Sequence, residues 1–463
     1  MNPRFLLSVC AAAALAVTGC LPEKRIVWSP DGSRAAVATP NGLFFVDRTG
    51  VVQKPRLKGS ATLCHWMPDG RRLAVVHVSQ EVSWEALAGI LPQVEREGIM
   101  AFAAEVHRRI LEFTGDWDAF DLGKGDNESS ETAAAALLYL RDHDAGQIRE
   151  KIGPDKWKDL QDLDISIHTL QIFGLDGDAL EPGQILWRSL YSLRQPLVDP
   201  QGRFVGVIRG GGVDQEDMFS LHVVAIAGGA PRLVASNVSL DFAWSPDGRN
   251  LAFIRSGDPE HESESNIHLG SLTTVCVADA EGKLLEEWTQ MQDRVGLLFN
   301  QALGVEWLRD GRLMFASVEV SLPATSRDMP QQWSVFSLDP RTPASVTRVV
   351  ARDFGEPVDP GLPLFEISPD EGRVLLPGPK GRLSLYEFAA GSTTVLADAD
   401  DPEGKTRCLP YWRADGAVCF VRPKAGAPPK SQEVELVIWK DGTTSPFGAD
   451  WPDAMKDGWL TGG

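Results

Sequence analysis

A five-residue string recurs seven times along the chain and constrains its fold more than any other feature. Its fullest form, Trp-Ser-Pro-Asp-Gly, stands at residues 28–32 and 244–248. The remaining copies keep most of these residue types and lie at 66–70, 198–202, 307–311, 367–372 (with one inserted residue before Gly372) and 412–416. Runs rich in β-formers follow most copies, as at residues 73–78 and 251–254. Seven copies in 463 residues indicate one large repeat architecture rather than two or three globular domains.

Each string has the chemistry of a tight turn between two strands. Pro presets φ at the first corner of a type I turn, Asp accepts hydrogen bonds from nearby backbone N–H groups, and Gly supplies the positive φ that lets the next strand pair. The Trp that opens five copies is large enough to fill the space between neighbouring sheets. The residues to which we assign this structural role are Trp28, Asp31, Gly32, Trp66, Asp69, Gly70, Trp244, Asp247, Gly248, Trp307, Asp310, Gly311, Asp370, Trp412, Asp415 and Gly416.

The strings resemble the PD40 (WD40-like) repeat of TolB-type and prolyl-oligopeptidase-type β-propellers. The resemblance covers nearly all of the chain after residue 20. Without a long insertion at 79–164, about 51 residues remain per repeat, close to the ~40 to 50 of a four-stranded propeller blade. We therefore expect an all-β fold, a seven-bladed β-propeller with an α-helical insertion in blade 2. Six blades are the alternative, should the third copy not form a turn.

The first twenty residues are organised like an export signal. Arg4 precedes an apolar run at 5–17 that is too short to span a membrane as a helix. Residues 17–20, Val-Thr-Gly-Cys, resemble a bacterial lipobox, which implies removal of the signal peptide 1–19 and lipidation of Cys20. The alternative is an ordinary secretory signal with an incidental Cys. We expect residues 20–463 to form the propeller, anchored by lipid in the bacterial cell envelope, facing the periplasm or at the outer membrane.

Composition excludes several classes of partner and chemistry. The formal net charge of −19 argues against nucleic acid, because such a surface repels phosphate backbones. No Cys-x-x-Cys pair or zinc-like His spacing occurs, so we expect no metal and no cofactor. Cys408 and Cys419 flank one predicted hairpin, and either a disulfide or two buried thiols would suit them.

Enzyme activity is not expected. Prolyl oligopeptidases join their propeller to a hydrolase domain whose nucleophile lies in Gly-x-Ser-x-Gly, and this string is absent. TolB itself carries an α/β domain before its propeller, whereas Trp28 follows Cys20 by only eight residues. This departure from TolB argues against carrying over its specific Tol-system role, so the resemblance implies the fold and says little about activity. We assign no catalytic residue.

The insertion at 79–164 carries about half of the excess negative charge, with nineteen acidic and nine basic side chains. Apolar residues recur in it at helical spacing, and Pro92, Ser130 and Pro154 mark helix boundaries. We expect an acidic helical lid or arm, which either caps the channel or presents apolar helix faces to a protein or peptide. The candidate binding residues here are Trp84, Phe102 and Trp157. Four aspartates between 116 and 126 miss the EF-hand spacing for calcium.

Long links between the second and third strands of several blades are expected to gather on one face, where loops of a rigid scaffold usually bind. Arg209, which precedes three glycines, and Arg255 lie in such links, as do His261 and Glu262. These four are candidate binding residues, and a mobile glycine link and a solvated acidic loop are the alternatives.

Together these features favour a non-enzymatic protein–protein interaction scaffold, held in the envelope by lipid. The alternative is a ligand-sensing or catalytic propeller that binds a small molecule, peptide or metal at its central channel. An exposed apolar patch on the insertion would favour the scaffold, whereas carboxylates and His converging at the channel would favour the alternative.

Overall fold

The computed structural model describes residues 24–50, 57–58, 60–115, 117, 129–176, 179–211, 219–256, 273–289, 291–292, 295–298, 303–321, 332–342, 346–352, 364–377, 382–397, 410–423, 434–447, 451 and 455. Of the predicted residues, Cys20, the four aspartates at 116–126, His261, Glu262 and Cys408 lie outside these ranges. No helix in the described ranges is long and apolar enough to cross a membrane.

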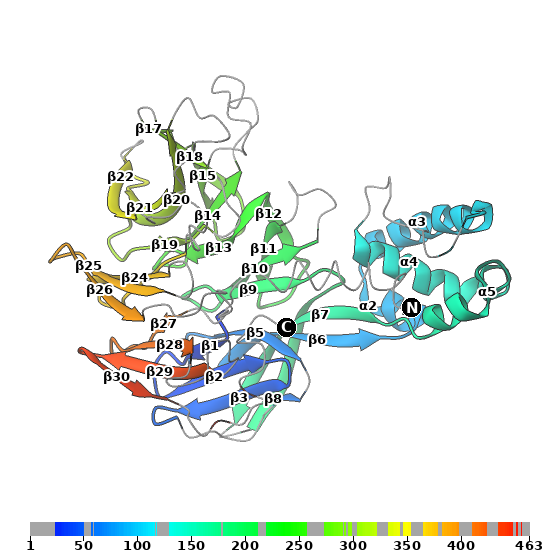
Figure 1. Ribbon diagram of the computed structural model, residues 1–463, viewed down its shortest axis with the longest axis horizontal. Helices are drawn as coiled ribbons and strands as arrows, with labels where there is room; N and C mark the ends of the chain where they lie inside the picture. The colour runs from blue at the N-terminus through cyan, green and yellow to red at the C-terminus, as the bar shows by residue number, and fades with distance from the viewer. Residues whose placement is uncertain are drawn as a thin grey trace.

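The described strands form seven antiparallel sheets set around a ring, each built mainly from four strands consecutive in the chain (Figure 1). Blade 1 is formed by β1 (Ile26–Trp28), β2 (Arg34–Thr39), β3 (Gly42–Asp47) and β4 (Leu57–Lys58). Blade 2 is formed by β5 (Ala61–Trp66), β6 (Arg72–Glu81), β7 (Ile165–Asp176) and β8 (Ala179–Ser189). Blade 3 is formed by β9 (Leu193–Val198), β10 (Phe204–Gly210), β11 (Phe219–Ala225) and β12 (Arg232–Ser236). Blade 4 is β13 (Val238–Trp244), β14 (Asn250–Ser256), β15 (Thr273–Asp279) and β16 (Leu284–Thr289).

Blade 5 is β19 (Val305–Trp307), β20 (Leu313–Ser321), β21 (Gln332–Leu338) and β22 (Val346–Arg352), and the hairpin β17 (Met291–Gln292) and β18 (Val295–Leu298) pairs with the far end of β20. Blade 6 is formed by β23 (Glu366–Ile367), β24 (Arg373–Pro377), β25 (Leu383–Glu387) and β26 (Ser392–Ala397). Blade 7 is formed by β27 (Tyr411–Trp412), β28 (Val418–Pro423), β29 (Val434–Lys440) and β30 (Thr443–Pro446). The predicted PD40-type seven-bladed β-propeller is therefore confirmed as a fold.

The repeat strings form the turns between the first and second strands. In the first copy, Gly32 takes φ 62° and its N–H donates to the Ser29 carbonyl (2.7 Å). Asp31 Oδ1 accepts hydrogen bonds from Ser29 Oγ (2.6 Å) and from the Ser33 N–H (3.0 Å). These bonds to the charged form lower the pKa of the Asp31 carboxyl to about 2.

The third copy forms the same turn without the Trp and the Ser. Gly202 takes φ 69° and its N–H donates to the Asp199 carbonyl (2.9 Å). The fully buried carboxylate of Asp199 accepts from the N–H groups of Arg203 and Phe204, and so replaces the missing hydroxyl as well. This turn excludes the six-bladed alternative.

The sixth copy departs from the predicted alignment. Instead of an inserted residue before Gly372, Glu371 itself stands at the glycine position, with φ 58° and its N–H donating to the Ser368 carbonyl (2.8 Å). Ser368 N–H donates to the Arg373 carbonyl, so the turn keeps the length of the other copies. Glu371 Oε1 accepts from the Arg309 N–H (2.8 Å), a bond that offsets part of the strain of a non-glycine residue with positive φ.

The repeat Trp side chains join each blade to the one before it. Three of the indole N–H groups donate to a backbone carbonyl on the first strand of the preceding blade. The accepting residue stands one position before the repeat string of that preceding blade. These bonds are Trp66 Nε1 to Val27 O (2.9 Å), Trp244 Nε1 to Leu197 O (3.0 Å) and Trp412 Nε1 to Glu366 O (3.1 Å). These Trp residues of the repeat strings thus link neighbouring blades of the ring.

Every gap between neighbouring blades holds one cluster of buried apolar side chains, and the seventh cluster closes the ring between blades 7 and 1. Among the described residues the two blades share no strand. Instead, Trp28 packs against Phe447 (6.2 Å between ring centroids) and Trp451 Nε1 donates to the Gly50 carbonyl (2.8 Å). Within the described part of the chain, these side-chain contacts join blades 7 and 1.

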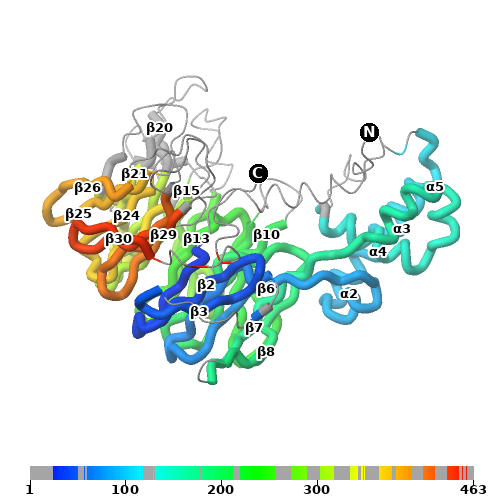
Figure 2. Tube along the Cα trace, turned by 60° about the horizontal axis from the view of Figure 1, so that its bottom comes forward, coloured from blue at the N-terminus to red at the C-terminus, as the bar shows by residue number. Residues whose placement is uncertain are grey.

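The helical insertion leaves the ring between β6 and β7, which stay paired from Arg72–Gly174 to Glu81–Ile165. It contains α2 (Trp84–Ile90), α3 (Gln93–Glu112), α4 (Ser130–His143) and α5 (Ala145–Gln161). In Figures 1 and 2 these helices project sideways from the ring and do not cover its centre. We call them the arm, because the expected channel-capping lid is not formed by these helices.

Candidate functional site

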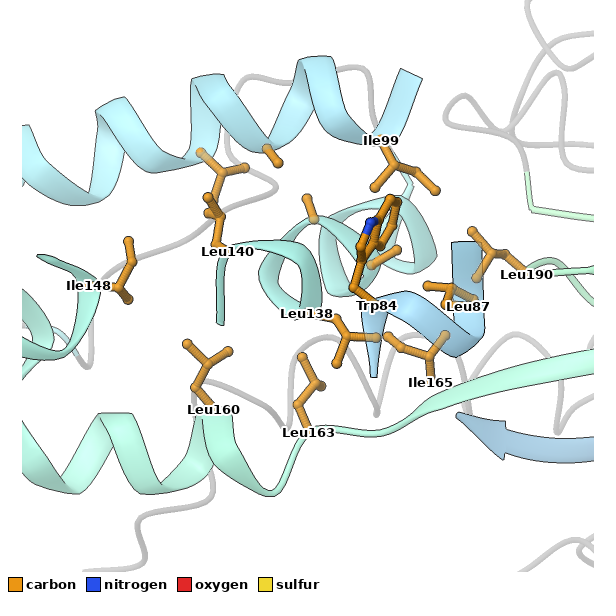
Figure 3. Close-up of a cluster of buried hydrophobic side chains, with 14 of the residues drawn as sticks. Trp84, Leu87, Ile99, Leu138, Leu140, Ile148, Leu160, Leu163, Ile165 and Leu190 are labelled. Atoms are coloured by element: carbon orange, nitrogen blue, oxygen red, sulfur yellow. The ribbon is translucent and has the colours of Figure 1, made fainter. Parts of the chain in front are cut away.

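The three aromatic candidates of the arm lie inside it. Trp84 and Trp157 are buried, and Phe102 packs against the same apolar cluster. Figure 3 shows Trp84 between Ile99 of α3 and Leu138 of α4. Four short helices can bury these rings only against one another, so the rings serve the core of the arm and are not displayed to a partner.

The outer face of α3 is the apolar surface that the arm does expose. Val94, Met100 and Leu111 are 80%, 43% and 39% exposed. Met100, Ala104 and Leu111 follow at spacings of four and seven, so they form one stripe along the helix. Ion pairs from Arg108 to Glu105 and to Glu112 (both 2.6 Å) border this stripe. The arm thus offers apolar side chains within an acidic surface.

Arg209 holds the arm against blade 3. Its Nη2 lies 3.6 Å from Glu95 Oε1 of α3, and its guanidinium lies 3.9 Å from the centre of the Tyr191 ring. The Tyr191 hydroxyl is in turn hydrogen-bonded to Thr132 Oγ1 of α4 (2.9 Å). Burial raises the pKa of the Glu95 carboxyl, although Arg209 opposes this shift. The Arg209–Glu95 pair therefore joins α3 of the arm to β10 of blade 3.

The glycines after Arg209 make this docking possible. A Cβ atom at Gly211 would lie 2.1 Å from Tyr191 Cδ1, and Gly211 also has φ +97°. A Cβ atom at Gly210 would lie 2.4 Å from Ser192 Oγ. The close approach of Tyr191 to Gly211 and of Ser192 to Gly210 thus explains the described part of the glycine run without a ligand.

Arg255 lies at the end of β14 and is paired as well. Its Nη2 contacts Glu287 Oε1 of β16, and Cys276 of β15 lies between them. Burial raises the pKa of the Cys276 thiol to about 12, so this thiol stays protonated. Arg255 therefore stabilises the outer half of blade 4.

A polar cluster that the sequence analysis did not identify lies in the central channel. The first strands of the blades line this channel, and three of them contribute Asp241, Glu306 and Glu366. Lys24 Nζ lies 2.5 Å from Glu366 Oε1. Gln195 Nε2 donates to Asp241 Oδ1 (3.2 Å), and the Val305 N–H donates to Asp241 Oδ2 (3.1 Å). We call Lys24, Asp241, Glu306 and Glu366 the channel cluster.

The channel cluster contains three carboxyl groups and one ammonium group. Burial and the mutual repulsion of the carboxylates shift the pKa values of these groups. Burial raises the pKa of Asp241 to about 6 and raises that of Glu306 further, because Glu366 adds a like charge nearby. Burial opposes the charge of Lys24, but the carboxylates outweigh it and raise the pKa of Lys24. One ammonium thus balances a set of carboxyl groups that are only partly ionised near neutral pH.

No group of three or more His, Cys, Asp and Glu side chains in the described ranges is arranged to hold a metal ion. His65, on the first strand of blade 2, accepts a hydrogen bond at Nδ1 from the Val198 N–H (3.4 Å). Burial lowers the pKa of His65 to about 4, so the ring is neutral. The side chains present in the channel are suited to binding a cation such as Lys24 rather than to proton transfer by His.

A sequence signal for the channel cluster does exist. Asp241, Glu306 and Glu366 stand three, one and one positions before the residue that opens the repeat string of their blade. An acidic residue is unusual on an inner strand of a buried sheet. These offsets differ by two residues, so the three acidic side chains lie on the same face of their strands, and their occurrence on the first strands of three consecutive blades indicates a common site on the axis of a propeller.

No protein-family model matches the chain, and no curated protein matches it. Solved structures with a similar fold include oligogalacturonate lyase in complex with manganese, which is 11% identical with a TM-score of 0.49 and covers 93% of this chain and 90% of the other. TolB from Acinetobacter baumannii is 13% identical with a TM-score of 0.37, and 60% of this chain matches 59% of that one. The propeller domain of the Trilobed protease from Pyrococcus furiosus is 18% identical with a TM-score of 0.37, over 61% and 74%. The chain thus spans less than two thirds of the TolB chain, and these similarities concern the fold alone.

Proposed function

We propose that the protein is a non-enzymatic scaffold of the bacterial cell envelope whose arm binds a protein partner. The observation that carries the proposal is the exposed apolar stripe on α3, on an arm that projects away from the ring. The ring has a closed set of apolar clusters without the arm, so the arm is not needed to complete its packing. An element of this kind is suited to meeting another molecule.

The charge of the arm defines the chemistry of the partner. Nineteen acidic side chains against nine basic ones give residues 79–164 a strongly negative field. A partner that covers Met100 and Leu111 with apolar side chains and surrounds them with Lys or Arg would be attracted and then held. The partner is therefore expected to be basic, and its association to weaken with salt.

Lipidation of Cys20 is part of the proposal. It would hold the scaffold at a membrane of the envelope, at the periplasmic side or at the outer membrane, and concentrate it where its partner lies. The supporting observation is the lipobox-like string at 17–20.

Replacing the arm by a tight turn tests the proposal. Glu81 and Ile165 are directly paired across β6 and β7, so a two-residue Asn-Gly turn between them closes the hairpin in place of residues 82–164. The ring should stay folded, as checked by circular dichroism and thermal unfolding, and crosslinking in intact cells should no longer capture the partner captured by the full chain. Unchanged capture by a folded, arm-less ring would contradict the proposal.

A second candidate function follows from the channel cluster. Its surplus of carboxyl groups favours a cationic small molecule at the channel, in competition with Lys24. Arginine and calcium chloride are suitable probes, and a rise in the thermal midpoint that disappears in Asp241→Asn would support such a site. The same rise in wild type and variant would assign it to non-specific binding.

A further inference from the structure

The position of Lys24 and Arg25 shows at which face of the ring the first blade begins. The Ala38 N–H donates to the Arg25 carbonyl (2.8 Å), which sets residue 25 beside the end of β2. Because the strands of a blade are antiparallel, the start of the first strand, the end of the second and the start of the third lie on one face. The arm leaves blade 2 between its second and third strands, so it emerges on this same face. We call it the arm face and the opposite one, which carries the repeat turns, the turn face.

Very little chain separates this face from the proposed lipid anchor. Cys20 and Lys24 are four residues apart, and four residues of fully extended chain span at most about 14 Å. Lys24 cannot move away from the ring to lengthen this tether, because its Nζ contacts Glu366 inside the channel. An acylated Cys20 would therefore keep the mouth of the channel close to the lipid headgroups.

We propose that the arm face lies against the lipid bilayer and that the turn face points away from it. This inference rests on the proposed lipidation of Cys20 and adds an orientation to it. The turn face is about 20 Å farther from the membrane, since β2 runs for six residues between the two faces. The arm then extends along the membrane surface, where it meets partners that are themselves bound to the membrane.

The acyl chains supply the attraction, at about 0.8 kcal/mol for each buried CH₂ group. The acidic arm opposes contact with anionic headgroups, but this repulsion is screened beyond about 8 Å at physiological salt. The orientation is thus set by the short tether and not by charge.

Fluorescence quenching from the headgroup layer tests the orientation. Asn41→Cys marks the arm face, in the exposed turn between β2 and β3, and Arg249→Cys marks the turn face, directly after Gly248. Cys64, Cys276 and Cys419 are buried and free, and Cys408→Ser removes the remaining thiol of the mature chain. Each variant is exported, purified with its lipid, labelled and placed in vesicles of phosphatidylethanolamine and phosphatidylglycerol that contain headgroup-spin-labelled lipid.

The label at position 41 should be quenched several-fold more than the label at position 249. A ten-residue Gly-Ser insertion after Pro22 should remove most of this difference while the protein still sediments with vesicles, since such a linker spans about 18 Å on average. Equal quenching at both positions in a lipidated, sedimenting protein would overturn the orientation and leave the arm face free for a protein partner. Absence of acyl mass on Cys20 would instead overturn the anchor itself.

Discussion

The ring and the arm bury their apolar side chains in different ways. In the ring, each cluster lies between two blades, so each blade depends on both neighbours. In the arm, one cluster lies among four helices, and its described members reach the ring at β7, through Ile165 and Ile167, and at Leu190 and Tyr191. The ring is therefore one cooperative unit closed on itself, whereas the arm is a separate unit held by two strands and a few polar contacts.

The largest expected effects test this difference in cooperativity. Phe253→Ala in blade 4 and Trp84→Ala in the arm each remove a buried ring, at an expected cost of about 3–5 kcal/mol in the free energy of unfolding. Phe253→Ala should lower hydrogen-exchange protection throughout the ring, because no blade folds without its neighbours. Trp84→Ala should lower protection only within residues 84–161. Loss of protection throughout the ring in Trp84→Ala would show that the two units are not separate.

The indole bonds between blades give the next largest effect. Trp244→Phe leaves the partly buried Leu197 carbonyl without its donor and should lower the free energy of unfolding by about 1–3 kcal/mol, as measured by chemical denaturation. Trp28→Phe is the matched control at the ring closure, because the buried Trp28 Nε1 reaches no backbone carbonyl among the described residues. It should cost clearly less. Equal losses of stability in the two variants would mean that Trp244 contributes through the packing of its indole and not through its hydrogen bond.

The channel cluster predicts how the stability of the ring depends on pH. The pKa of Asp241 is raised from 3.8 to about 6, so between these values the folded state binds more protons than the unfolded state. The contribution of Asp241 to the free energy of unfolding therefore falls as pH rises through this window, by about 1–2 kcal/mol. Urea denaturation at a series of pH values should show a shallower fall for Asp241→Asn. An identical pH profile for wild type and variant would exclude Asp241 as the cause.

The smallest effect concerns the sixth repeat turn. Glu371→Gly removes the strain of a positive φ, about 1 kcal/mol, but also the bond to the Arg309 N–H. We expect a change within about 0.5 kcal/mol in thermal unfolding. Glu371→Ala loses the bond and keeps the strain, so it should be about 1 kcal/mol less stable than wild type. Equal stability of the two variants would argue that φ at this position carries no strain.

The sequence predicts the ring well because the evidence for each blade is local. The turn chemistry of residues 28–32 is complete within one string, and even the degenerate copy at 198–202 forms its turn through Asp199. The predicted alignment is wrong only at Glu371, where a side-chain bond to the turn of the preceding blade offsets the strain that a glycine would avoid.

The candidate sites were harder to predict because their contacts are distant in the sequence. Helical periodicity identified Trp84, Phe102 and Trp157 as apolar positions, but it could not tell a face buried within the arm from an exposed one. The sequence predicts Arg209 as a ligand-binding residue, but its side chain pairs with Glu95, which lies more than one hundred residues away in the chain. The channel cluster joins blades 1, 4, 5 and 6, and its acidic residues converge only once the ring closes.

The most direct test of the account is photo-crosslinking in intact cells from Met100 on the arm, compared with Arg249 on the turn face. We predict that a photoreactive residue at Met100 forms a crosslink to one basic partner, and that Leu111→Asp abolishes this crosslink. Gln147→Asp, which adds the same charge at another exposed helix position of the arm, should preserve it. Crosslinks from position 249 alone, or a crosslink at position 100 that Leu111→Asp leaves unchanged, would contradict the assignment of the arm as the binding element.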